Sequence, residues 1–235
     1  MRNDRIVSGV GAVMTTVGII GSGMIGGTVA RLSVAAGHQV VLSNSRGPET
    51  LKELAAELGP LARPATAEQA GEAGDLVVVS VPVKAFGDIP AKPLAGKAVL
   101  DTGNYYPPRD GHILELDTGA LTSSGLLQRY LPEAHVVKVF NNIFFRHLQY
   151  LPRPSGADDR SALPIAGDDA AVKAAVTAFL DSIGYDAVDA GPLAESWRQE
   201  PGTPVYGTPY GPFDDEMGMQ ADAAKIRTLL VGALR

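Results

Sequence analysis

The segment Val17–Arg46, VGIIGSGMIGGTVARLSVAAGHQVVLSNSR, contains the pattern that decides the fold. An apolar run, Val17–Ile20, precedes the glycine-rich turn Gly21–Gly26. An amphipathic segment then leads to Gly37 and to a second apolar run, Gln39–Leu42. This order of strand, Gly-x-Gly-x-x-Gly turn, helix and strand is typical of a unit that binds a dinucleotide. In an α/β protein that binds no nucleotide, the same turn would only connect the strand to the helix.

The turn residues predict how a pyrophosphate is held. Gly21 permits the tight turn, Gly23 lets the backbone approach the pyrophosphate, and Gly26 lets the helix pack closely on its strand. Free amide groups at the start of the helix, with their partial positive charge, favour the phosphates. We therefore predict that the cofactor-binding turn consists of Gly21, Ser22, Gly23, Met24, Ile25 and Gly26.

The end of the second apolar run indicates which dinucleotide is bound. An NAD site usually has an Asp or Glu about 20 residues beyond the turn, which accepts a hydrogen bond from the ribose 2′-hydroxyl. This chain instead has Asn44, Ser45 and Arg46, with no carboxylate before Glu49. A guanidinium binds a 2′-phosphate at two points, and Ser and Asn add donors, whereas a carboxylate would repel it. We predict NADP(H) rather than NAD(H); the alternative for Arg46 is a solvated loop residue.

Length and composition exclude several classes of protein. The 235 residues suffice for one core and a small second lobe, and a net charge of −6 argues against a general nucleic-acid binder. Without cysteine there is no disulfide and no thiolate nucleophile. The charge-free span Ile6–Ala30 contains the glycine turn and is rich in Gly, Ser and Thr, so we expect neither a cleaved signal nor a membrane anchor. We predict a cytoplasmic protein in which residues 1–14 form an N-terminal extension.

Apolar runs alternate with helical patterns as far as residue 143. The sequence predicts strands at Asp75–Pro82, Lys97–Asn104 and His135–Ile143, and helices at Pro48–Leu58, Ala65–Gly74 and Leu114–Tyr130. This alternation predicts an α/β fold with a Rossmann-type, doubly wound, mostly parallel sheet over residues 15–143.

The pattern changes after residue 143. Two short strands are predicted at Leu163–Gly167 and Tyr185–Val188, and two helices at Asp168–Ile183 and Asp214–Leu234. We expect residues 144–235 to form a small C-terminal α+β lobe that serves substrate binding or dimerisation.

Polar side chains follow the predicted strands, at the sheet edge formed by the carboxyl ends of the strands, which we call the rim. A doubly wound sheet binds its ligands there. We predict that the nicotinamide lies over Val81, Pro82, Val83, Gly103, Asn104 and Asn141. Asn141 could bind a substrate carbonyl or the cofactor carboxamide, or it could simply cap a turn. For the substrate pocket we predict Asn142, Trp197 and Tyr206; packing is the alternative for the two aromatic residues.

No proton donor stands out in the sequence. His147 is the first candidate because it follows a strand of this rim, and Tyr105 or Tyr106 could also donate, although each has a packing role as its alternative. The other histidines have no partners at metal-binding spacing, so no metal site is predicted.

Several segments together resemble the F420-dependent NADP oxidoreductase family, the NADPH:coenzyme F420 reductases. They are VGIIGSGMIGGTVARL, GHQVVLSNSR, DLVVVSVP, VVKVFNNI, IAGDD and DAGPL, which lie within Thr15–Tyr210. The resemblance implies a Rossmann domain, a small C-terminal lobe and a homodimer. It also implies hydride transfer between the nicotinamide and a deazaflavin ring that is stacked between the lobes.

The resemblance assigns roles at matching positions. It implies that Ser22–Ile25 bind the pyrophosphate, Ser45 and Arg46 the 2′-phosphate, and that Val81–Pro82 lie near the nicotinamide. Asn141 stands where archaeal members that reduce the deazaflavin have a histidine, and Thr50 where they have a lysine. The sequence after Leu193 also departs from those members.

The residues predict an NADPH-dependent oxidoreductase, and the resemblance implies coenzyme F420 as its co-substrate. Transfer between two stacked rings needs alignment rather than a strong acid. One alternative is an NADPH-dependent reductase of a small organic C=O or C=N group, which would need a proton donor near the rim. Another is a non-catalytic NADPH-binding sensor. The expected partners are small molecules and a second copy of the chain, with no nucleic acid and no membrane.

Overall fold

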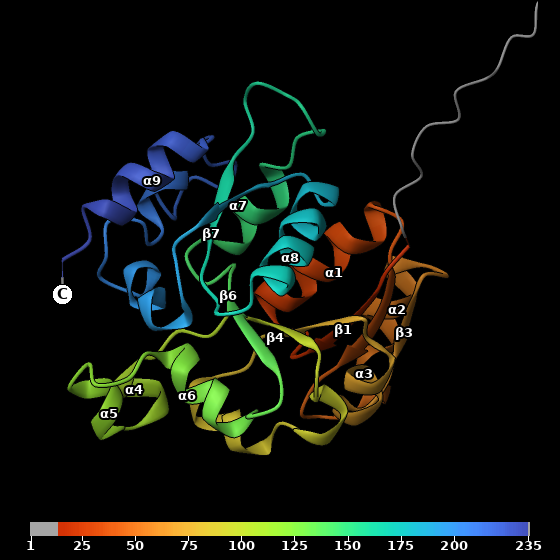
Figure 1. The fold of residues 1–235 in the computed structure, drawn as a ribbon. Helices are drawn as coiled ribbons and strands as arrows, with labels where there is room; N and C mark the ends of the chain where they lie inside the picture. Colours follow the sequence, from red (N-terminus) through yellow and green to blue (C-terminus); the bar gives the residue numbers. More distant parts are fainter. Residues whose placement is uncertain (1–13, 235) are drawn as a thin grey trace, which may run out of the picture.

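A six-stranded parallel sheet forms the centre of the protein. The structure is a computed structural model that describes residues 14–234 (Figure 1). The strands of this sheet lie in the order β3-β2-β1-β4-β5-β6. They are β1 (Thr16–Ile20), β2 (Gln39–Ser43), β3 (Ala62–Pro64), β4 (Leu76–Val79), β5 (Ala98–Asp101) and β6 (His135–Lys138). All neighbouring strands are parallel, and the order reverses between β1 and β4. The predicted Rossmann-type, doubly wound fold is confirmed.

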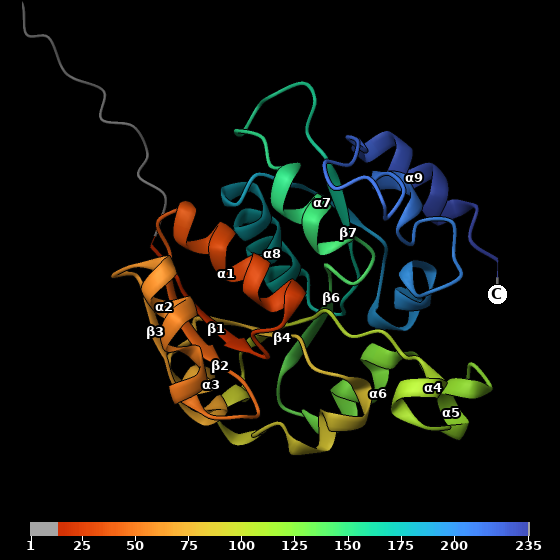
Figure 2. The ribbon, with the colours of Figure 1, turned by 180° about the vertical axis from the view of Figure 1, so that it is seen from behind.

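Both faces of this sheet are buried, which explains its uninterrupted β-branched strands. Along β4, Leu76 and Val78 belong to one core, while Val77 and Val79 belong to the other. The first core also contains side chains of α1 (Met24–Ala35) and α8 (Ala170–Ser182), which lie on one side of the sheet (Figure 2). The second contains side chains of α3 (Ala67–Ala73) and α6 (Ser123–Tyr130).

Side-chain caps determine where several helices begin. The Thr66 hydroxyl accepts a hydrogen bond from Gln69 N at 3.2 Å, and the Gln69 side chain accepts one from Thr66 N at 3.1 Å. This reciprocal pair begins α3 as a capping box. At the start of α8, Asp169 Oδ1 accepts from Ala171 N and Val172 N at 2.8 and 3.0 Å. Threonine and aspartate are among the residues that most often cap a helix in this way.

The C-terminal lobe is built on a second, two-stranded sheet. Parallel strands β7 (Ala162–Ile165) and β8 (Asp186–Asp189) are connected by α8. An antiparallel bridge joins Lys138, at the end of β6, to Ala166. The remaining helices of the lobe are α7 (Phe145–Tyr150), the 3-10 helices η4 (Leu193–Gln199) and η5 (Thr208–Tyr210), and α9 (Ala223–Val231). The first core of the large sheet continues into this lobe, so the two parts pack as one body.

Two predicted helices are wrong in extent. The segment Leu114–Tyr130 divides into α5 (Leu114–Asp117) and α6, because Thr122 caps α6 by accepting from Gly125 N at 3.0 Å. The predicted helix Asp214–Leu234 shortens to α9, which Asp222 caps through Lys225 N at 2.7 Å. In both cases an Asx- or Thr-type cap starts a helix later than the apolar spacing suggested.

Smaller elements complete the fold. The predicted helix at Pro48–Leu58 consists of a 3-10 turn, η1 (Pro48–Leu51), followed by α2 (Lys52–Leu58). The sequence pattern did not predict β3, α4 (Pro107–Asp110), α7, η2 (Val83–Asp88) or η3 (Lys92–Leu94). Within residues 14–234, every helix is too short or too polar to span a bilayer. The predicted N-terminal extension lies, except for Met14, outside the described residues.

Candidate active site

The glycine turn between β1 and α1 has one open position. A Cβ atom added at Gly21 would overlap the carbonyl oxygen of Ser80, and one at Gly26 would overlap that of Gly21. At Gly23, in contrast, an added Cβ would meet no atom within 4 Å. Helix α1 begins there without a capping side chain and without an acidic residue in its first turn. An open approach to uncapped N–H groups fits a pyrophosphate.

The carbonyl oxygen of Ser43, at the end of β2, holds this turn. It accepts hydrogen bonds from Gly21 N at 3.0 Å, from Ser22 N at 3.1 Å and from the Ser22 hydroxyl at 3.0 Å. The turn after β1 and the loop after β2 are therefore fixed to each other. Ser22, which the sequence assigned to the pyrophosphate, uses its hydroxyl to make this link.

The loop after β2 presents an arginine to solvent. Asn44 Oδ1 accepts from Arg46 N at 2.9 Å, and Asn44 Nδ2 donates to the Thr50 hydroxyl at 2.9 Å. Ser45 and Arg46 are exposed, and within residues 14–234 the Arg46 guanidinium has neither a hydrogen bond nor an ion pair. Asn44 thus folds the loop, while Ser45 and Arg46 remain available to a phosphate.

A cavity of about 340 Å³ opens at the first residues of α1. The loops after β5, β6 and η4 form its other walls, which combine aromatic and aliphatic side chains with three amides and one guanidinium. The lining residues are Met24, Ile25, Thr102, Asn104, Tyr106, Arg109, Asn141, Asn142, Ile143, Phe144, Phe145, Tyr206, Gly207 and Phe213. Among the site residues predicted from the sequence, this cavity brings together Met24, Ile25, Asn104, Asn141, Asn142 and Tyr206.

The other predicted rim residues do not line the cavity. Val81 lies against the glycine turn, with its Cγ1 2.9 Å from the Cβ position of Gly21. Pro82 is the N-cap of η2, and Val83, the first residue of η2, is buried in the second core. Gly103 N donates to Asp101 Oδ1 at 2.7 Å, which fixes the loop that carries Asn104. These residues thus pack against the turn and the loops that carry the cavity residues, and do not face the cavity themselves.

Two tyrosine hydroxyls meet in the cavity wall. Tyr106 and Tyr206, from segments 100 residues apart, share a hydrogen bond. The Arg109 guanidinium lies over the Tyr106 ring, 5.0 Å from its centre, and also binds Asp110 and the carbonyl oxygen of Asn104. Burial and the bond to Tyr106 raise the pKa of Tyr206 above the ordinary value of 10. Tyr206 therefore keeps its proton throughout the physiological pH range.

The amide of Asn141 is occupied by protein partners. Its Nδ2 donates to Asn104 Oδ1 at 3.0 Å and to the Gln199 carbonyl at 2.6 Å, while its Oδ1 accepts from Gln199 Nε2 at 3.0 Å. Asn141 therefore connects the β5 loop to η4. The sequence had proposed it as a ligand of the substrate or of the carboxamide.

Asn142 presents the unused acceptor instead. Its Nδ2 donates to the Val205 carbonyl at 3.0 Å, which fixes the orientation of the amide. Its Oδ1 is buried and has no hydrogen-bond partner within the described part of the chain. Asn142 lines the cavity, and its side-chain oxygen is a buried acceptor that the described protein groups leave unused.

His147 and Trp197 do not line the cavity. His147 is fully buried, and its Nε2 donates to the Asp215 carbonyl at 2.6 Å. Its ring packs edge-on against Phe144, with 5.3 Å between the ring centres. Trp197 lies in η4 beneath the Arg198 guanidinium, 4.5 Å from the ring centre. Phe144 forms part of the wall against which His147 packs.

A buried ion pair lies at the ends of β5 and β6, next to the loop that carries Gly103 and Asn104. The sequence analysis did not predict it. Lys138 Nζ lies 3.2 Å from Asp101 Oδ2, and both side chains are fully buried. The ammonium also donates to the Gly103 carbonyl and to Ser123 Oγ, and Ser124 Oγ donates to Asp101 at 2.6 Å. A lysine that ends an apolar strand just before the rim was the available signal.

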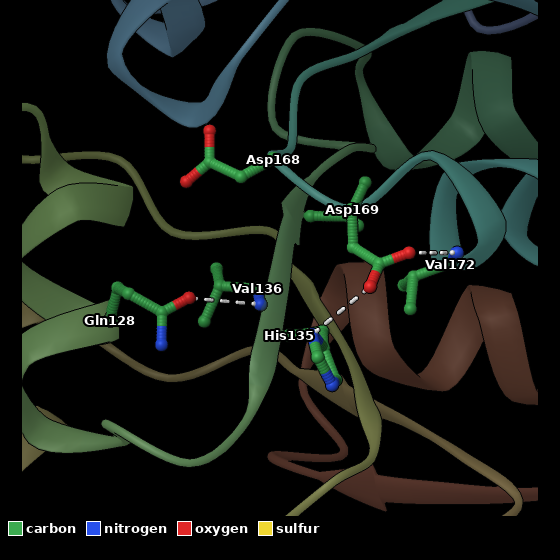
Figure 3. A pocket seen from close by; sticks show the side chains of 7 residues that line it. Gln128, His135, Val136, Asp168, Asp169 and Val172 are labelled. Atoms are coloured by element: carbon green, nitrogen blue, oxygen red, sulfur yellow. Dashed lines mark hydrogen bonds and ion pairs between the residues drawn. The ribbon is translucent and has the colours of Figure 1, made fainter.

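A separate polar pocket of about 300 Å³ lies beside β6 (Figure 3). His135 Nδ1 is 3.7 Å from Asp169 Oδ2, and Gln128 Oε1 accepts from Val136 N at 3.2 Å. Figure 3 shows Asp169 between His135 and the start of α8, while Asp168 points away from both. No residue predicted for the cofactor lines this pocket.

Comparison with known families agrees with this geometry. The family model "NADP oxidoreductase coenzyme F420-dependent" matches residues 16–105, which include the glycine turn, the Arg46 loop and the rim as far as Asn104. The predicted family resemblance is confirmed. The predicted enzyme class is confirmed with it, because the matched family consists of NADP-dependent oxidoreductases.

Two solved structures and one curated protein are also similar to this chain. SMa0349 from Sinorhizobium meliloti is 25% identical with a TM-score of 0.73, and the match covers 89% of this chain and 97% of that one. The "putative f420 dependent nadp-reductase" from Arthrobacter sp. FB24 is 26% identical with a TM-score of 0.64, covering 78% and 87%. YjhV of Escherichia coli (strain K12) is 42% identical over 53 residues, which are 23% of this chain and 39% of YjhV. The chain thus spans about two fifths of that relative.

Proposed function

We propose that this protein transfers a hydride between NADP(H) and a deazaflavin, coenzyme F420. The observation that carries the proposal is the position of the aromatic cavity, which begins at Met24 and Ile25, directly beside the open phosphate turn at Gly23. A dinucleotide whose pyrophosphate lies at this turn can extend one end into the cavity. The description of the matched family and the name of the Arthrobacter relative support the same acceptor.

The described residues fit NADP(H). Gly23 and the first N–H groups of α1 would hold the pyrophosphate, and Ser45 and Arg46 would hold the 2′-phosphate. Asn142 Oδ1 would accept an N–H group from a ring bound in the cavity. NADP(H), when bound, supplies or accepts the hydride.

The cavity walls suit a flat conjugated ring. Phe144 packs edge-to-face against Phe145 and against Phe213, with 4.7 and 5.5 Å between the respective ring centres. Together with Met24 they form an apolar surface against which a deazaflavin could stack. Fixed walls that align two rings lower the barrier to transfer by removing unproductive orientations. The protein would contribute alignment, and the rings their own redox chemistry.

Anaerobic mixing of NADPH with oxidised coenzyme F420 tests this proposal. We expect the deazaflavin absorbance to bleach only when the protein is present. Gly23→Val is the matched variant: an added Cβ meets no protein atom within 4 Å, while the valine side chain blocks the approach of the pyrophosphate, so bleaching should be lost. No bleaching with the wild-type protein at any pH between roughly 5 and 9 would contradict the proposal.

A small organic C=O or C=N compound is the second candidate substrate. The hydroxyl pair of Tyr106 and Tyr206 favours it, because such a substrate requires a proton beside the carbon that receives the hydride. Following NADPH absorbance with small aldehydes, ketones and cyclic imines distinguishes the two candidates. Turnover of one of these compounds without bleaching of the deazaflavin would replace the first proposal with the second.

We also propose that the working form is a homodimer, which the family resemblance supports. The other partners of the protein would be small molecules that bind in the cavity.

A further inference from the structure

The two hydroxyls of Tyr106 and Tyr206 play different roles in the hydrogen bond that they share. In a hydrogen bond between two hydroxyls, one donates and the other accepts, so the accepting hydroxyl keeps a free proton. Tyr106 and Tyr206 both line the cavity, which places that free proton within reach of a ligand. Arg109 lies over the ring of Tyr106, so a negative charge that develops on this pair is best stabilised at Tyr106.

We propose that Tyr106 is the proton donor of this active site and that Tyr206 and Arg109 are positioning residues that stabilise its phenolate. The inference rests on the proposed oxidoreductase function. It applies to either substrate class, since reduction of a deazaflavin or of a C=X bond adds one hydride and one proton.

One proton passes from Tyr106 to the substrate. The O–H bond of Tyr106 breaks and a new bond forms between that proton and the substrate nitrogen or oxygen, while a carbon atom gains the hydride that NADPH supplies. In a C=O or C=N group this carbon is bonded to the atom that is protonated, and in a deazaflavin it is a ring carbon conjugated with the nitrogen that is protonated. The phenolate left on Tyr106 accepts a hydrogen bond from Tyr206 and is later protonated by water. In the opposite direction of the reaction, the Tyr106 phenolate takes the proton back.

Tyr206 suits the stabilising role better than the donating role. Burial and its bond to Tyr106 raise the pKa of Tyr206, so it holds its proton when Tyr106 loses one. His147 cannot replace either residue, because its Nε2 is used by the Asp215 carbonyl and its ring does not reach the cavity.

The charged groups that face the pair are Arg109 and Asp110, both in α4. Arg109 Nε and Nη2 bind Asp110 at 3.1 and 2.8 Å, and Nη2 also donates to the Asn104 carbonyl at 2.6 Å. Asp110 Oδ2 also accepts from Tyr106 N at 3.0 Å. These contacts hold the guanidinium in place over the ring, so its field acts on Tyr106 in a fixed geometry.

A titration without cofactor tests the pair directly. The protein is labelled with 3-fluorotyrosine, the Tyr106 signal is assigned with Tyr106→Phe, and its ionisation is followed by ¹⁹F NMR. We expect the ionisation midpoint of Tyr106 to be higher in Tyr206→Phe than in the wild type, because the phenolate loses the hydroxyl that would donate to it. An unchanged midpoint would overturn the proposal.

Tyr105→Phe is the matched control for this titration. The hydroxyl of Tyr105 bonds to the Gly111 carbonyl at 3.0 Å and to Asp117 at 2.6 Å, and it does not line the cavity. Removal of this hydroxyl from the adjacent residue should leave the Tyr106 midpoint where it is in the wild type. An equal shift in Tyr105→Phe and Tyr206→Phe would show a general effect of the loop and overturn the assignment.

Single-turnover reduction of an acceptor tests the donor role. We expect Tyr106→Phe to slow the transfer about 10²- to 10⁴-fold with unchanged NADPH affinity, and Tyr206→Phe to slow it less and move the alkaline limb of the pH profile upward. Equal rates for wild type and Tyr106→Phe would overturn the proton donor while the oxidoreductase function stands. A wild-type protein that reduces neither coenzyme F420 nor an organic acceptor would overturn the function itself.

Discussion

Arg46 is the residue on which the choice of cofactor depends. It is exposed at the end of β2, its backbone is held by Asn44, and within residues 14–234 its guanidinium binds no protein group. A guanidinium without a protein partner can bind a phosphate without first breaking an ion pair. The cofactor proposed above therefore has one testable dependence on a single charge.

Arg46→Ala should weaken NADPH binding by about 1–3 kcal/mol and leave NADH binding unchanged, because only NADPH carries the 2′-phosphate. Titration calorimetry with both cofactors measures the difference. Arg129→Ala, which removes the same charge from α6, is the control and should change neither affinity. Equal losses for NADPH and NADH in Arg46→Ala would remove the assignment of the 2′-phosphate to this side chain.

Single residues differ in how well the sequence predicts their roles. Gly21 and Gly26 were predictable because their role is set by the local backbone, where any side chain would meet a carbonyl oxygen. The hydrogen-bond partners of the Asn141 side chain could not be predicted in this way, because its partner Gln199 lies 58 residues away in the sequence. Spacing along the chain determines a turn, but it does not show which amide a distant loop will occupy.

Helices and strands also differ in how well the sequence predicts them. The β-branched run Leu76–Val79 predicted β4 because burial on both faces demands such a sequence. Helix α4, which carries Arg109, has only four residues and begins with two prolines, so it offers no apolar periodicity to detect. The cavity wall that it forms became visible only from the contacts of the folded chain.

Asp110 at the end of α4 provides a test of this element. Burial alone would raise the pKa of Asp110, but hydrogen bonds from Arg109 and from the backbone N–H groups of Tyr106 and Lys84 bring it below its usual 3.8. A folded-state pKa below the unfolded value adds stability that is present above about pH 4 and is lost as the pH falls through the folded value.

Asp110→Asn should therefore lower the free energy of unfolding by about 1–3 kcal/mol at pH 7, and the difference from the wild type should shrink below about pH 4. Urea unfolding at both pH values measures it. The exposed Asp88→Asn is the control and should stay within about 0.5 kcal/mol of the wild type. A difference that grows on acidification would show that the carboxylate does not stabilise α4.

At the scale of the whole molecule, the sheet and the C-terminal lobe share contacts that no single segment encodes. The bridge between Lys138 and Ala166 joins them, and Glu200 of the lobe accepts from Ser123 N and Oγ at 2.8 and 2.7 Å. The first core runs through both parts. A change in sequence pattern near residue 143 therefore separates two segments of the chain that fold against a common interior.

This shared interior predicts one cooperative unfolding transition for the whole chain. Calorimetric and van't Hoff enthalpies should agree, and NADPH at 100 times its dissociation constant should stabilise the entire transition by about 2.7 kcal/mol. Gly23→Val should unfold within about 1 kcal/mol of the wild type without NADPH, since an added Cβ meets no atom within 4 Å and valine only replaces glycine at the N-cap of α1. It should gain no stability when NADPH is added. Two separate transitions, with only one of them shifted by NADPH, would mean that the lobe folds independently and that the cavity between the two parts is not held by a common core.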